Sequence, residues 1–321
     1  MKKFVVGMII ASFLAVAGSA SAATVFEKNN FTYEIKGDWQ IQLRQDPGDD
    51  QDMDVEYDDL EIKNKISYDI NETLSAFGEL DFGFKNAADK SNSDEDPHLE
   101  EANIGFKIRD TKVFFGKADS AGDEFGVAAT YETIVADDCF DEFGAVDGDD
   151  LIGVSTKIGD MVNVMTTYEI EAESESSDNN GEFFDIYADV NFEGLTLGAA
   201  YQSLEPSGSD NDIKTMGAQV SYDAEFAAFG ADYSVTEDDD DSDESVWNLF
   251  VEVPVKPVTI AVGYVTLDYD DGSDDEKVAG WYGNITYKFP SAKNVRLFAE
   301  ISDSDETDVD MGYMVGARLK F

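Results

Sequence analysis

Residues 310–321, DMGYMVGARLKF, decide the fold that this chain adopts. They alternate in polarity, and one side of the extended chain carries the apolar residues Tyr313, Val315, Ala317, Leu319 and Phe321. Alternation with a period of two residues predicts a β-strand with one apolar face. In water, a long edge strand that ends on an aromatic residue would invite aggregation. In a lipid bilayer, the same strand can close a β-barrel, with its terminal ring at the membrane interface.

The N-terminus has the parts of an export signal. Lys2 and Lys3 are followed by an uncharged apolar run, and residues 20–22 (ASA) have the small side chains of a cleavage site. The apolar run is too short for a permanent transmembrane helix, so an uncleaved anchor is the weaker interpretation. We predict a signal peptide at residues 1–22 and a mature barrel domain at residues 23–321.

Composition narrows the class of function. The chain has 70 acidic and 22 basic residues, and its net charge of −48 repels nucleic acid and concentrates cations. Its 22 Phe, 14 Tyr and 3 Trp distinguish it from disordered acidic chains. The single cysteine, Cys139, rules out an internal disulfide; we interpret it as an incidental loop residue, with intermolecular pairing as the alternative. The single histidine, His98, excludes most histidine-based metal and triad chemistry, so we predict no catalytic residues and no cofactor.

The mature region repeats one unit. An alternating segment, a short turn, a second alternating segment and a long acidic loop follow one another along the chain. This rhythm predicts about sixteen strands, an even number as in bacterial outer-membrane barrels. We place them near residues 31–44, 59–68, 74–85, 101–109, 111–117, 151–158, 161–169, 183–192, 195–202, 215–222, 227–234, 246–253, 258–265, 279–289, 295–301 and 312–321.

The connections are sorted by length. Those at residues 159–160 and 193–194 are short, whereas those at residues 86–98, 119–150 and 237–244 are long and acidic. Short turns on one side and long loops on the other are typical of a barrel that spans a membrane. A soluble barrel would leave its apolar face bare, which lipid prevents. The polar face would then enclose water, because about sixteen strands make a barrel wide enough for an aqueous channel.

The longest connection carries a resemblance to a known family. The run FFGKAD at residues 114–119 enters it, EFG occurs at residues 124–126 and 142–144, and the chain ends in RLKF at residues 318–321. Together with the export signal and the rhythm of strands and loops, these motifs make the whole mature chain resemble the general diffusion porins of Gram-negative outer membranes. The resemblance implies an all-β transmembrane antiparallel barrel of about sixteen strands.

The resemblance also implies that the third loop, residues 119–150, folds into the lumen and narrows it. Its helix-favouring residues predict a short helix over residues 127–135. The acidic residues expected at the constriction are Asp119, Asp123, Glu124, Asp137, Asp138, Asp141 and Glu142. The basic residues expected on the opposite pore wall are Lys36, Lys63, Lys65, Lys85, Lys107, Arg296 and Arg318. Such an arrangement would set up a transverse field that penalises apolar solutes.

Several partners follow from the same resemblance. It implies an outer-membrane location with lipid around the barrel, and a homotrimer in which residues 86–98 reach a neighbouring subunit. It also implies that Phe321 is recognised by the machinery that assembles outer-membrane barrels. We expect the last strand to pair with residues 31–44, because this pairing closes the barrel.

The expected function is passive diffusion of ions and small hydrophilic solutes. The acid excess predicts a preference for cations. The basic residues expected on the pore wall oppose this preference, because charge farther than a Debye length of about 8 Å from the constriction has less influence on passing ions. The alternative is a substrate-selective channel of the same architecture, but the aromatic residues that alternation directs inward are scattered: Phe77, Phe114, Tyr187, Phe250, Tyr282 and Phe298. An outer-membrane enzyme and a plugged adhesive barrel are weaker alternatives. Acidic runs such as residues 237–244 could bind Ca²⁺ or Mg²⁺ weakly, but they lack the spacing of an EF-hand loop.

Overall fold

The structure is a computed structural model of the chain. It describes residues 23–45, 52–85, 97–132, 135–171, 181–208, 211–238, 243–270, 275–306 and 311–321. The signal peptide predicted at residues 1–22 lies outside the described residues.

Strands make up most of the described chain. The first nine are β1 (Ala23–Lys28), β2 (Phe31–Gln45), β3 (Asp54–Glu56), β4 (Leu60–Asn71), β5 (Leu74–Gly83), β6 (His98–Ile108), β7 (Thr111–Asp119), β8 (Asp147–Ile158) and β9 (Val162–Glu169). The others are β10 (Glu182–Phe192), β11 (Leu195–Glu205), β12 (Ile213–Asp223), β13 (Ala228–Asp238), β14 (Asp243–Val255), β15 (Val258–Asp270), β16 (Asp275–Phe289), β17 (Ala292–Ser304) and β18 (Gly312–Lys320). Two short helices, η1 (Gly122–Glu124) and α3 (Cys139–Glu142), lie between β7 and β8.

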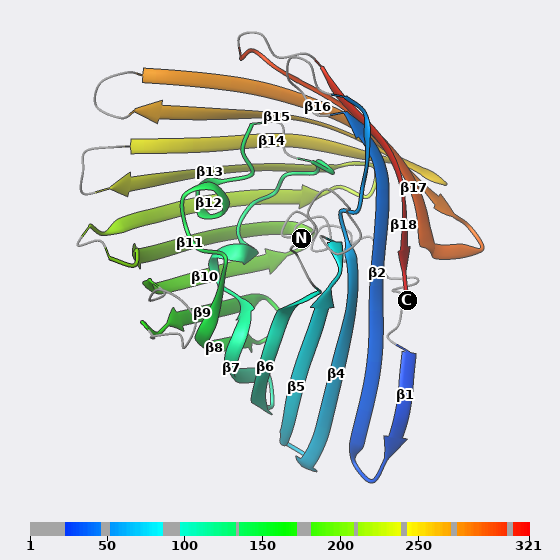
Figure 1. Ribbon diagram of the computed structural model, residues 1–321, viewed down its shortest axis with the longest axis vertical. Helices are drawn as coiled ribbons and strands as arrows, with labels where there is room; N and C mark the ends of the chain where they lie inside the picture. The colour runs from blue at the N-terminus through cyan, green and yellow to red at the C-terminus, as the bar shows by residue number, and fades with distance from the viewer. Residues whose placement is uncertain are drawn as a thin grey trace.

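The sixteen longer strands, β2 and β4–β18, form a closed antiparallel ring (Figure 1). Consecutive strands pair around it, β9 pairs with β10, β18 pairs with β2, and β2 pairs with β4. The short strands β1 and β3 pair with β2. The predicted sixteen-stranded antiparallel barrel is therefore confirmed, as is the pairing of the last strand with the segment at residues 31–44.

The two faces of each strand differ sharply. On β17, Leu297 and Ile301 are 46% and 47% exposed, whereas Phe298 and Glu300 are 3% and 2% exposed. The exposed face is apolar around the ring, which suits a lipid environment. No helix in the described part of the chain has the length and apolar character needed to cross a membrane.

The C-terminal residue is fixed at the seam of the ring. The Phe321 N–H donates to the Gly37 carbonyl at 3.0 Å, and the Phe321 carbonyl accepts from the Gly37 N–H at 2.8 Å. The Phe321 ring meets the Trp39 ring edge-on, with centroids 5.5 Å apart. A Cβ atom on Gly37 would lie 2.2 Å from the Phe321 ring, so any larger residue there would require the ring to move. Recognition of Phe321 during assembly stays a prediction.

Candidate functional site

Residues 120–146, between β7 and β8, form the candidate site. The helix predicted over residues 127–135 is wrong for the described part of that range, which has no regular structure. Instead, the N–H groups of Val127, Ala129 and Tyr131 donate to side chains of the barrel strands. A spacing of two residues is that of an extended chain, so these strand side chains fix a conformation that local helix propensity does not favour.

The segment contacts strand after strand around the ring. Figure 1 shows it (green-cyan) crossing in front of the strands that follow β9. Each hydrogen-bonding partner belongs to the face opposite the exposed apolar one: Thr167 on β9, Asp185 on β10, Gln202 on β11, Gln219 on β12, Asp232 on β13, Asn248 on β14, Tyr282 on β16, Glu300 on β17 and Gln42 on β2. Such a path requires a strand wall whose inner polar groups match the backbone of the segment.

Glu300 makes the densest of these attachments. Its Oε2 accepts from the Tyr131 N–H at 2.8 Å, and its Oε1 accepts from the Glu132 N–H at 3.1 Å and the Thr130 hydroxyl at 2.8 Å. Asn284 Nδ2 donates to Glu300 Oε2 at 3.0 Å and to the Ala129 carbonyl at 2.7 Å. A buried carboxylate that accepts this many bonds holds the local backbone firmly.

Aromatic contacts support the same attachment. Tyr131 stacks on Phe298 of β17, with centroids 4.1 Å apart and an interplanar angle of 11°. Val127 packs among Phe250 and Tyr282. Of the six aromatic residues predicted to point inward, five are buried: Phe114, Tyr187, Phe250, Tyr282 and Phe298. They therefore serve as packing surface rather than as an open aromatic track.

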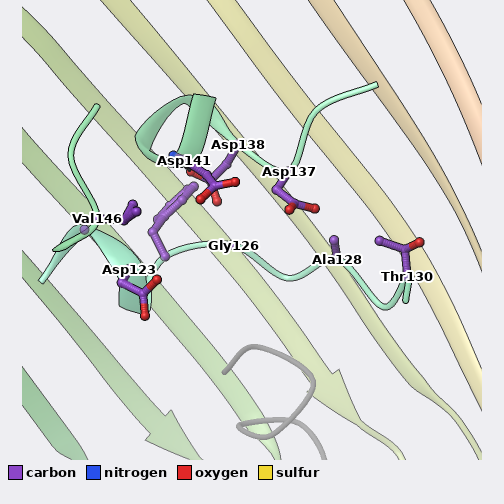
Figure 2. Close-up of a pocket in the computed structure, with 10 residues that line it drawn as sticks. Asp123, Gly126, Ala128, Thr130, Asp137, Asp138, Asp141 and Val146 are labelled. Carbon is purple, nitrogen blue, oxygen red and sulfur yellow. Dashed lines mark hydrogen bonds between the residues drawn. The ribbon is translucent and has the colours of Figure 1, made fainter. Parts of the chain in front are cut away.

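Four of the predicted acidic residues come together. Asp123, Asp137, Asp138 and Asp141 border one recess (Figure 2), and no Lys or Arg is among its described lining residues. Asp138 caps α3 by accepting from the N–H groups of Phe140 and Asp141 at 2.8 and 3.2 Å. Burial, followed by the Asp232 carboxylate, raises the pKa of Asp138 well above its ordinary value.

The remaining predicted acidic residues lie elsewhere. Asp119 ends β7, and Glu124 ends η1, where burial raises the pKa of its carboxyl, with Asp119 adding to the shift. Glu142 is exposed at the end of α3 and accepts from the Asp137 N–H at 3.3 Å. None of these three lines the recess.

Four of the predicted basic residues have carboxylate partners. Lys63 contacts Asp81 at 2.9 Å and Glu101 at 2.7 Å. Lys65 contacts Glu79 at 2.7 Å, and Lys85 contacts Asp58 at 3.4 Å. Arg318, which is only 2% exposed, pairs with Asp38 and lies 2.9 Å from Asp59. These partners offset much of the positive charge expected on the wall.

The other three predicted bases have no ion pair among the described residues. Arg296 lies in register with Lys288 on one side and Arg318 on the other, which gives a basic row across β16, β17 and β18. Lys36 lies on β2 opposite Lys63. Lys107 is exposed near the end of β6. The bases thus lie on contiguous strands, but they do not form one exposed strip.

Sequence reasoning missed the residues that attach the segment. Glu132 contacts Arg44 of β2 at 3.1 Å and accepts from Gln42 Nε2 at 2.9 Å. Asp232 and Glu300 accept from the backbone of the segment on two other strands. The sequence does carry one signal for these residues. Alternation places acidic side chains at inward positions of the strands, where contact with water alone would not require a charged group.

Comparisons with known proteins agree on the class of protein. The family model described as Gram-negative porin matches residues 9–309. Porin-like protein H of Photobacterium profundum is 23% identical over 342 residues, covering all of both chains. Putative outer membrane porin protein NmpC of Escherichia coli is 28% identical over 225 residues, covering 63% of this chain and 58% of that protein.

Solved structures share the fold. OmpT of Vibrio cholerae in its trimer form has a TM-score of 0.76 and 17% identity, covering 91% of this chain and 99% of that chain. Salmonella typhi OmpF in complex with daunomycin has a TM-score of 0.76 and 14% identity, with 92% and 99% coverage. An anion-selective porin from Comamonas acidovorans has a TM-score of 0.71 and 14% identity, with 91% and 100% coverage.

Proposed function

The chain belongs to the Gram-negative porin family, and we propose that its outer-membrane channel is water-filled and passes ions and small hydrophilic solutes by passive diffusion, with a preference for cations. The observation that carries this proposal is the path of residues 120–146 over the polar face of the ring. The acidic recess within that segment gives the preference its sign.

The segment sets the width of the channel. Its hydrogen bonds reach nine strands of a closed ring, from β9 through β17 to β2, and always on the face opposite the apolar one. A segment of this length reaches so many strands only from the enclosed side. It therefore occupies part of the lumen and leaves a narrower passage beside it.

Fixed charge at this passage favours cations. Asp123, Asp137 and Asp141 share one recess, and the described residues that line it include no basic side chain. On the facing strands, Lys63 and Arg318 are already paired with carboxylates. Carboxylates gathered at a passage attract cations and repel anions, and the extreme acidity of the chain adds to the effect.

A substrate-selective channel is the second candidate. Its aromatic track would have to face water, but the inward aromatic residues Phe250, Tyr282 and Phe298 are covered by the segment. This burial favours general diffusion. The fold does not decide ion selectivity, since the Comamonas acidovorans structure with the same fold is described as anion-selective.

We also propose that the chain works as a homotrimer in outer-membrane lipid, since the OmpT structure with the same fold is described in a trimer form. The assembly machinery would recognise the strand that ends in Phe321. Gel mobility of unboiled against boiled protein separates trimer from monomer.

Two measurements test the proposed channel. In planar bilayers, the purified protein should give discrete conductance steps; their absence would contradict a water-filled channel. In liposome swelling with sugars of graded size, entry rates should fall smoothly with solute size. A strong preference for one sugar class at equal size would favour the substrate-selective alternative.

A further inference from the structure

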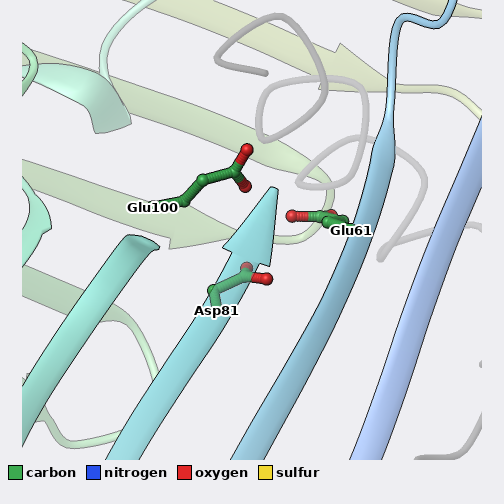
Figure 3. A group of neighbouring side chains, drawn as sticks. All are labelled: Glu61, Asp81 and Glu100. Carbon is green, nitrogen blue, oxygen red and sulfur yellow. The ribbon is translucent and has the colours of Figure 1, made fainter. Parts of the chain in front are cut away.

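Three carboxyl groups meet on neighbouring strands at the ends that adjoin long connections. Glu61 lies on β4, Asp81 on β5 and Glu100 on β6. One oxygen atom of each lies within 4.8 Å of the others, and Figure 3 shows the three groups turned toward a common space. None of the three takes part in the contacts that hold residues 120–146.

A β-bulge brings the third carboxylate into this group. Asp81 lies opposite Glu101, and the register then shifts so that Glu100 is an extra residue on β6. In a regular strand, two successive side chains face opposite sides of the sheet. Here Glu101 contacts Lys63 at 2.7 Å while Glu100 joins the cluster, so both carboxylates lie on the inner face of the sheet. Bulges commonly re-aim a side chain in this way next to functional sites.

The cluster leaves buried oxygen atoms unsatisfied. Asp81 is 1% exposed, and the Glu100 side chain is 9% exposed. Among the residues that the structure describes, Asp81 Oδ1 and Glu100 Oε2 have no hydrogen-bond partner. Lys63 Nζ contacts the other oxygen of Asp81, at 2.9 Å, and His98 Nε2 lies 3.7 Å from the other oxygen of Glu100. A buried carboxylate oxygen without a partner is costly, which points to a positively charged ligand at this cluster.

We propose that Glu61, Asp81 and Glu100 bind a calcium ion. Calcium takes carboxylate oxygens at about 2.3–2.6 Å, so two ligands of one ion lie at most about 5 Å apart, and the cluster meets this limit. Magnesium, at about 2.0–2.1 Å, requires a tighter and more regular set of ligands. Water can complete the coordination. The ion joins β4, β5 and β6 at the ends where the barrel passes into its long connections.

Calcium titration of the purified full-length protein in detergent tests this site. By calorimetry, the protein should show one saturable site per chain above the weak binding of its many exposed acids. Calcium should also raise the unfolding temperature relative to EDTA. Glu100→Gln and Asp81→Asn should weaken the saturable site by about tenfold or more and remove the rise in unfolding temperature. The control Glu237→Gln, an exposed acid near the end of β13, makes the same change of charge and should leave both intact.

Three results would overturn the proposal. One is the absence of a saturable site in the wild-type protein. Another is a calcium affinity of the saturable site that is unchanged in Glu100→Gln. If that variant does not fold, Glu61→Gln is tested instead, and an unchanged affinity there would overturn the proposal as well. The third is competition by magnesium at equal concentration, which would contradict the assignment to calcium.

Discussion

Glu300→Ala is the substitution that tests the attachment of residues 120–146 most sharply. Glu300 accepts from the backbone N–H groups of Tyr131 and Glu132. Hydrogen bonds to a charged group contribute roughly 1.5–3 kcal/mol each, so losing these two weakens the attachment by about 3–6 kcal/mol. The detached population should rise by roughly 10²–10⁴-fold, since about 1.4 kcal/mol is a factor of ten. Strand pairing does not depend on this side chain, so the barrel should still form.

Single-channel recording measures the consequence. We expect Glu300→Ala to raise the mean conductance and the current noise, because the segment spends more time away from the wall. The mean conductance and current noise of Glu300→Gln should fall between those of Glu300→Ala and wild type, since its carboxamide keeps one accepting oxygen of two. Glu252→Gln is the control: it removes a charge from the inner face of β14, where its charged neighbours are Lys288, Arg296 and Asp223. If Glu300→Ala and Glu252→Gln give the same conductance and current noise, the segment does not control the channel.

Three further predictions follow from other parts of the structure. Gly37→Ala should lower the yield of heat-modifiable barrel, because its Cβ would collide with the terminal ring, and deletion of Phe321 should lower it too; normal assembly of both variants would refute this. Burial, with the Glu132 carboxylate, raises the pKa of Asp58 to about 6, so the folded state binds the proton more tightly than the unfolded chain. The contribution of Asp58 to the free energy of unfolding is then fully present below about pH 4, and about 3 kcal/mol of it is lost as the pH rises through 6; Asp58→Asn should remove this part of the pH dependence in thermal unfolding. Burial raises the pKa of the Cys139 thiol to about 11, so iodoacetamide should label it in urea but not in the folded protein; rapid native labelling would contradict its burial.

Alternation of polarity located all sixteen long strands, but not where each one ends. The strands predicted at residues 258–265 and 279–289 extend to Asp270 and from Asp275 in the structure. Beyond the membrane both faces of a strand meet water, so the apolar alternation stops while the backbone ladder continues. Acidic residues that the sequence pattern assigns to loops therefore belong to strands in the structure.

The candidate site was predictable in composition and not in its attachments. Its acids stand together in the sequence, and Asp123, Asp137 and Asp141 do share a recess. The residues that anchor the segment do not lie near it in the sequence. Asp232 and Glu300 are 105 and 169 residues from the backbone groups whose hydrogen bonds they accept. Closure of the ring decides which strands face the segment, and no local pattern encodes that. In the described part of residues 127–135, the predicted helix fails for the same reason, because distant acceptors compete with a weak local propensity.

The reversal potential in a KCl gradient tests the central claim most directly. With purified protein in a planar bilayer, we predict a potential whose sign shows potassium crossing faster than chloride. Changing Asp123, Asp137 and Asp141 together to Asn should move this potential toward zero. A wild-type potential of the opposite sign, showing faster chloride, would contradict the account.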